Sequence, residues 1–109
     1  MDRNLLLALQ TLFYDRLGLA MDLANAFDSL DQLRQDLTAY WHERGLSPAL
    51  LGKISPSLMA FNIDQEHTVL SQKGIHYITL ADPGYPPLLK ELSDPPLALF
   101  YQGNSALLT

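Results

Sequence analysis

Apolar residues recur at helical spacing through the first part of the chain. They predict three amphipathic helices, with faces formed by Leu5, Leu9, Leu12 and Phe13, by Leu19, Leu23, Ala26 and Phe27, and by Leu30, Leu33, Leu37, Tyr40 and Trp41. Asp2 or Asn4 is placed to cap the first helix, and we expect Gly18 to interrupt it before the second begins. Ser29 with Gln32 forms the capping box that opens the third helix.

In the stretch that follows the third predicted helix, polar residues and prolines mark where helices begin and end. Ser47-Pro48 and Ser55-Pro56 each place an N-cap residue before a proline, which favours the first position of a helix. They predict two short helices. Asn62 is a further N-cap, and Gly74 ends the helix that it opens. Residues 1–73 are therefore predicted to form an all-α module of five or six short helices.

The pattern changes after Gly74. Residues 75–80 are β-branched and aromatic, and residues 82–84 have the composition of a turn. Residues 85–92 allow only a short helix begun by proline. Residues 97–101 then form a continuous apolar strand, which is typical of strands covered on both faces. We interpret residues 74–109 as the opening β-α-β of an α/β domain.

This α/β segment is too small to complete a domain. Two strands and one turn of helix cannot cover an apolar strand on both faces, and a two-stranded piece is marginal alone. We therefore expect the 109 residues to be a fragment of a longer protein. If they are not, a second chain should cover the strand, and dimerisation would follow from the exposed sheet edge.

Composition supports a folded chain without a nucleic-acid surface. Hydrophobic residues make up 48% and charged residues 17% of the sequence, as in globular domains. The net charge is −5, and both halves are acidic, whereas nucleic-acid binders gather basic residues. The absence of cysteine excludes disulfides and thiolate chemistry. No apolar run approaches the roughly 20 residues that span a bilayer, and we expect a cytoplasmic location.

Titratable residues form no pattern that predicts catalysis or metal binding. His42, His67 and His76 share no metal-ligand spacing. Asp82 and Asp94 are explained by turns. We therefore expect no catalytic residue, no metal site and no cofactor.

Aromatic and basic residues in the helices have structural explanations too. Tyr40-Trp41 could stack nucleobases, but a core role is favoured because Arg44 is the only basic neighbour. The remaining arginines are spread over different helices. We expect a solvated surface for Arg3, Arg16, Arg34 and Arg44.

Two proline turns lie at a fixed separation in residues 78–104. With the glycine that follows, they make this segment resemble the bacterial DNA-processing protein A family (DprA, also called Smf). Members of that family typically run I-T-L-x-D-P-x-Y-P-x-x-L-K-E-I-x-D-P-P-x-x-L-x-x-x-G here. The resemblance is strong for about 40 residues and loose elsewhere. The motif residues, which we interpret as structural, are Asp82, Tyr85, Pro86, Pro87, Leu88, Leu89, Asp94, Pro95, Pro96 and Gly103.

The resemblance implies a fold and a function. It implies a SAM-like or helix-hairpin-helix module followed by an extended Rossmann-like domain. Such a protein binds single-stranded DNA, dimerises and helps to load recombinase during natural transformation, without being an enzyme. The family's DNA-contacting Gly-Ser-Arg motif would lie beyond Thr109, so this portion would be structural or partner-contacting.

One departure from the family and two alternatives stay open. Residues 15–19 carry one glycine where many relatives have a glycine-rich hairpin, so packing is favoured there over phosphate binding. The chain could instead be a protein-interaction module that dimerises through residues 97–101. It could also be a fragment of a nucleotide-utilising Rossmann-type enzyme, because a fold does not fix a function.

Overall fold

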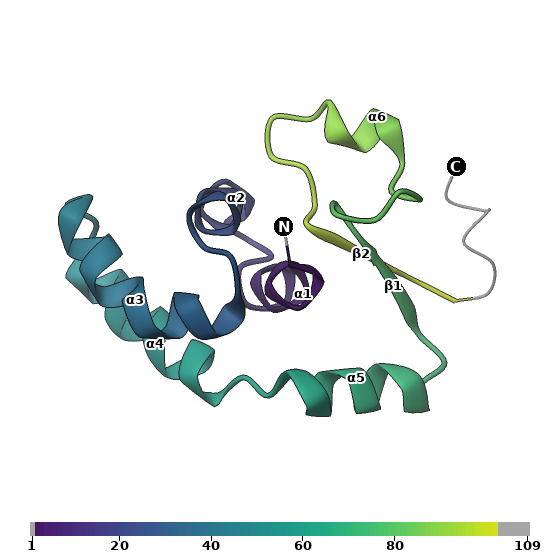
Figure 1. Cartoon of the computed structure of the whole chain (residues 1–109), viewed down its shortest axis with the longest axis horizontal. Helices are drawn as coiled ribbons and strands as arrows, with labels where there is room; N and C mark the ends of the chain where they lie inside the picture. Colours follow the sequence, from purple (N-terminus) through teal and green to yellow (C-terminus); the bar gives the residue numbers. More distant parts are fainter. Residues whose placement is uncertain (1, 103–109) are drawn as a thin grey trace.

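Helices precede a small two-stranded sheet in this computed structural model, which describes residues 2–102 (Figure 1). The elements are α1 (Arg3–Leu12), α2 (Leu17–Ala26), α3 (Leu30–Glu43), α4 (Pro48–Ala60), α5 (Ile63–Gln72), β1 (His76–Thr79), α6 (Pro87–Lys90) and β2 (Ala98–Tyr101). Five helices precede β1, within the predicted five or six, and the order of strand, helix and strand after them is as predicted. The division into units 1–73 and 74–109 stays a prediction.

Helix α1 occupies the centre of the molecule. Figure 1 shows it end-on, with α2, α3 and α4 on one side, the two strands on the other and α5 along the bottom of the view. Asp2 caps it by accepting a hydrogen bond from the Leu5 N–H at 3.0 Å. All residues from Leu5 to Leu9 are buried, because neighbours cover more than the single face that the spacing predicted.

The junction between α1 and α2 differs from the prediction. Gly18 does not interrupt α1, which ends at Leu12, where the Phe13 N–H donates to the Leu9 carbonyl at 2.8 Å. Gly18 lies in the first turn of α2, and a Cβ there would come within 3.3 Å of an Asp94 carboxylate oxygen. The glycine thus marks a close approach between α2 and a loop.

Helix α3 begins at the predicted cap Ser29, but the return bond of Gln32 goes to Asp28 instead of Ser29, so the predicted capping box is present in part. The Ser29 hydroxyl accepts from the Gln32 N–H at 3.1 Å, and the Gln32 side chain accepts from the Asp28 N–H at 2.7 Å. Near the other end, Trp41 is buried and its indole N–H donates to the Ser47 carbonyl at 2.7 Å. The core role predicted for Trp41 is confirmed.

Helix α4 is one helix rather than two. Ser47 caps it as predicted, but the prediction that Ser55-Pro56 begins a second helix is wrong, because α4 continues past Pro56 to Ala60. A proline inside a helix removes one backbone hydrogen bond. Ile54 and Leu58, four residues apart, are both buried in the apolar cluster, and α4 contacts both α3 and α1. This tertiary burial holds the chain helical through the proline.

Arg34 of α3 is not a solvated surface residue, contrary to the prediction. Its Nε donates to the Leu58 carbonyl at 3.3 Å, and Nη2 donates to the Phe61 carbonyl. These carbonyls lie at the end of α4, where helix carbonyls lack intrahelical partners and a cation is favoured. Arg34 therefore closes the end of α4.

Helix α5 has both predicted boundaries. The Asn62 side chain accepts from the Gln65 N–H at 3.0 Å. At the other end Gly74 has φ of +67°, and the Ile75 N–H returns to the Leu70 carbonyl at 2.8 Å. This left-handed glycine ends the helix and directs the chain into β1.

Strands β1 and β2 pair antiparallel, with His76 opposite Tyr101 and Thr79 opposite Ala98. The predicted order of strand, helix and strand is present. A crossover unit of a doubly wound sheet would instead make the two strands parallel. The connecting helix α6 has only four residues and spans about 6 Å, so it does not return the chain to the start of β1.

The sheet is covered unevenly. Ile78 and Ala98 are buried, whereas Phe100 is 44% exposed. Residues 97–101 are therefore not buried on both faces within the part of the chain that the structure describes. None of the helices in residues 2–102 combines the length and apolar character that crossing a bilayer requires.

Candidate functional site

Asp82 of the family-like motif lies directly after β1 and holds the turn that follows. Its carboxylate accepts from the Thr79 N–H at 2.7 Å and from the Thr79 hydroxyl at 3.1 Å. The same carboxylate meets Arg3 of α1, with Nε at 2.9 Å from Oδ1 and 3.1 Å from Oδ2. One side chain thus closes the turn and links it to a helix 79 residues earlier.

The ionisation of Asp82 reflects these partners. Burial disfavours the charged carboxylate, but hydrogen bonds from Thr79 and Arg3, together with the Arg3 charge, outweigh burial and lower the pKa of Asp82 below its usual value. Asp82 is therefore a charged hydrogen-bond acceptor at neutral pH. Such a group positions the chain and is poorly suited to general acid catalysis.

Tyr85 fills the space beneath the same turn. Its side chain is 2% exposed, and its hydroxyl donates to the Pro96 carbonyl at 2.7 Å. Burial raises the pKa of the Tyr85 hydroxyl, which keeps it a neutral donor. Pro95 is buried beside it. The tyrosine therefore ties the first proline turn of the motif to the second.

A partly buried hydrogen bond connects the second proline turn to α1. The Leu97 N–H donates to the Gln10 side-chain oxygen at 2.8 Å, although 87 residues separate them. The Leu97 carbonyl accepts from the Leu80 N–H at 3.1 Å. Leu97 is fully buried, so Gln10 satisfies a donor that water cannot reach.

The remaining motif residues lie around this connection. Pro86 and Pro87 begin α6, which presents Leu88 outward at 77% exposure and keeps Leu89 half-buried. Asp94 approaches Gly18 of α2. Gly103 lies outside the described residues. The structural role predicted for the ten motif residues stays a prediction.

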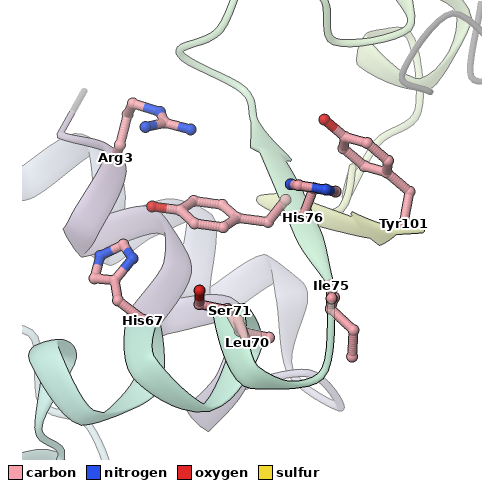
Figure 2. Close-up of a pocket in the computed structure, with 9 residues that line it drawn as sticks. Arg3, His67, Leu70, Ser71, Ile75, His76 and Tyr101 are labelled. Carbon is pink, nitrogen blue, oxygen red and sulfur yellow. The ribbon is translucent and has the colours of Figure 1, made fainter. Parts of the chain in front are cut away.

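A hollow of about 320 Å³ opens between α5, the start of β1 and the N-terminus of α1. Figure 2 shows Arg3 and His67 on one side, His76 and Tyr101 on the other, and Leu70 with Ser71 of α5 along the base. Tyr77 also lines it. The sequence indicated none of these residues as a group, because they come from separate elements.

Aromatic and cationic side chains are organised around this hollow. The Arg3 guanidinium lies 4.9 Å from the centre of the Tyr77 ring, and the His67 ring lies 5.6 Å from it. His76 and Tyr101 form a second ring pair at 5.5 Å. Burial raises the pKa of the Tyr77 hydroxyl, although the Arg3 charge opposes the shift. The hollow therefore carries ring surfaces and a cation.

The residues that line the hollow supply groups that can bind and position a ligand. No group of three or more His, Cys, Asp or Glu side chains in this range is arranged to hold a metal ion. The His67 Nε2 lies 3.0 Å from the Asn4 side-chain oxygen. The geometry offers planar surfaces and hydrogen-bond donors, without a nucleophile and base in contact.

Comparison with known proteins identifies one segment. Residues 76–109 match the family model of DNA recombination-mediator protein A. No curated protein and no solved structure matches the chain. The predicted resemblance to the DNA-processing protein A family is therefore confirmed for this segment, which includes Asp82, Tyr85 and the two proline turns.

Proposed function

We propose that this chain is the N-terminal part of a DNA recombination mediator of the DprA type. The match of residues 76–109 to that family is the observation that carries the proposal. In this proposal residues 1–73 are a SAM-like module, and residues 74–109 begin a Rossmann-like domain that continues beyond Thr109. The whole protein would bind single-stranded DNA in the cytoplasm and help to load recombinase during natural transformation.

The described portion is proposed to support that activity without supplying the DNA surface. The chain has twelve acidic and seven Lys or Arg residues. Neutralising phosphates provides most of the affinity of strand binders, so an acidic chain is unsuited to it. Gln10 of α1 accepts a hydrogen bond from Leu97, and Arg3 donates one to Asp82. These two links support a role for α1 in positioning the matched segment.

The test compares this chain with the full-length protein. We expect fluorescence anisotropy with labelled oligothymidine to give weaker than micromolar binding for residues 1–109 at physiological salt. The full-length protein should bind micromolar or tighter, with an affinity that falls as salt rises. A full-length protein that fails to bind single strands would contradict the proposal.

We also propose that the protein performs no bond-making chemistry. Asp82 is a salt-bridged carboxylate, and Tyr85 is a buried neutral phenol, neither suited to acid–base turnover near neutral pH. The full-length protein should accelerate recombinase assembly on a single strand without cleaving it or hydrolysing nucleotides. Nucleotide turnover above background, abolished by a substitution in the Rossmann-like domain, would favour the alternative that the protein is a nucleotide-utilising enzyme.

A dimerisation module is the second candidate, and the sheet favours it. Phe100 is 44% exposed on β2, between the half-buried Leu99 and Tyr101. A partly uncovered strand of this kind is a site for pairing with another chain. Sedimentation should then show a dimer that Phe100→Ser converts to a monomer. A monomer at all concentrations would exclude this candidate for residues 1–109.

A further inference from the structure

The hollow between α5, β1 and Arg3 is a built feature that the proposed function does not use. Its volume of about 320 Å³ is near the lower end of small-molecule sites. Its rings come from β1, β2 and α5, and its guanidinium comes from α1. The site therefore exists only where the N-terminal helix and the sheet meet.

The local charge differs from that of the whole chain. The chain carries a net charge of −5, yet no Asp or Glu lines the hollow, and Arg3, His67 and His76 do. Asp82 holds Arg3 through Nε. Within residues 2–102, no hydrogen bond occupies the Nη1 or Nη2 groups of Arg3. The guanidinium is thus fixed by one nitrogen and keeps donors for an anion.

The rings offer surfaces for a planar group. His76 is exposed, and Tyr77 and Tyr101 are half-buried, so ring area remains accessible. Stacking of a base on an aromatic side chain tolerates any base, because each has a π face. A ligand that combines a flat ring with an anionic group would use both the rings and Arg3.

We propose that this hollow binds one nucleotide unit, with its base against His76 and Tyr101 and its phosphate at Arg3. The proposal does not rest on the proposed function, since it concerns a single nucleotide and needs no strand-binding groove. Asp82 neutralises part of the Arg3 charge, so the site is weak. We expect a dissociation constant on the order of 1 mM, which is compatible with weaker than micromolar binding of oligonucleotides.

Nuclear magnetic resonance titration of the 109-residue chain tests this site. Thymidine 5′-monophosphate should saturably shift the amide signals of His76, Tyr77 and Tyr101. Ribose 5-phosphate and inorganic phosphate, which lack a base, should leave them unchanged at the same concentration. Equal shifts with phosphate alone, or no shifts at several millimolar nucleotide, would overturn the proposal.

Matched variants inside and outside the hollow distinguish a loss of this site from a general loss of structure or of nonspecific binding. Tyr101→Leu should weaken nucleotide binding at least threefold. The matched Tyr14→Leu, at a tyrosine 71% exposed and outside the hollow, should not change it. Should Tyr101→Leu unfold, His76→Gln at an exposed position replaces it, with the same expected loss. Equal affinity in both site variants and the control would refute the site.

The source of the nucleotide is resolved by a second ligand. A thymidine trinucleotide that binds at least as tightly as the monophosphate identifies one unit of a strand as the ligand. Binding of the monophosphate alone identifies a free nucleotide, whose terminal phosphate carries the larger charge. Both results retain the same chemistry, base against rings and phosphate at Arg3.

Discussion

The helices α1 to α4 and the segment from β1 to β2 are stabilised in different ways. The helices share one cluster of buried apolar side chains, to which Leu5, Leu33, Trp41 and Leu58 contribute. From the segment, Leu97 is the one buried residue in that cluster within the described chain, and the partly buried Leu80 packs against it. Polar links from α1 to Leu97 and Asp82 add to this smaller apolar attachment.

Because of this difference, we expect the helices to unfold cooperatively and the segment to open locally. Apolar burial is non-directional and spreads over many contacts, so removing one side chain weakens the whole helical cluster. A hydrogen bond such as that between Gln10 and Leu97 is directional and restrains one pair of residues. Its loss therefore frees only the chain around that pair. We therefore expect the segment to open locally before the helices unfold.

The largest expected effect is that of Leu33→Ala in α3. Leu33 is fully buried in the helical cluster, and such truncations cost about 2–5 kcal/mol. Urea unfolding followed by circular dichroism should show a lower midpoint with one cooperative transition. Leu88→Ala, at a leucine 77% exposed on α6, is the control and should change stability by less than about 0.5 kcal/mol. Equal losses would show that the cluster does not govern stability.

Local structure in the helices could be predicted because its causes lie within a few residues. The caps at Ser29 and Asn62 bond to amides three residues later, and Gly74 takes the left-handed conformation that ends α5. At Pro56 the same local reasoning gave a wrong prediction. The burial of Ile54 and Leu58 in the apolar cluster outweighs a local signal, and sequence spacing does not reveal which elements cover them.

The links to the segment could not be predicted from one sequence. Gln10 and Leu97 are 87 residues apart, and Arg3 and Asp82 are 79 apart. A single polar pair leaves no periodic pattern. The motif residue Asp82 was identified by resemblance to a family, but its partner Arg3 was expected to be merely solvated. The hollow was missed for the same reason, since four elements contribute to it.

An intermediate effect is expected for Gln10→Met, which keeps the side-chain length and removes the acceptor. The Leu97 N–H would stay buried without a partner, at a cost of about 1–3 kcal/mol. Amide hydrogen exchange should accelerate at Leu97 and Leu80 by more than in α3. The control is Gln35→Met, at an exposed position on α3. Uniform acceleration across α3 and the strands would break the distinction between the two regions.

The smallest expected effect is the pH dependence contributed by Asp82. Its folded-state pKa is lowered, so its contribution to stability is present above the ordinary aspartate pKa, about 3.9, and is lost as pH falls through the lower folded value. The Arg3 side chain is 51% exposed, which limits the pair to less than about 1 kcal/mol. Urea unfolding should therefore show Asp82→Asn less stable than wild type at pH 7, with the difference shrinking below about pH 4. In an Arg3→Gln background this shrinkage should be smaller, because one of the groups that favour the carboxylate is gone. A difference that grows on acidification would mean that Asp82 is protonated in the folded chain, and the link between α1 and the turn would then not be ionic.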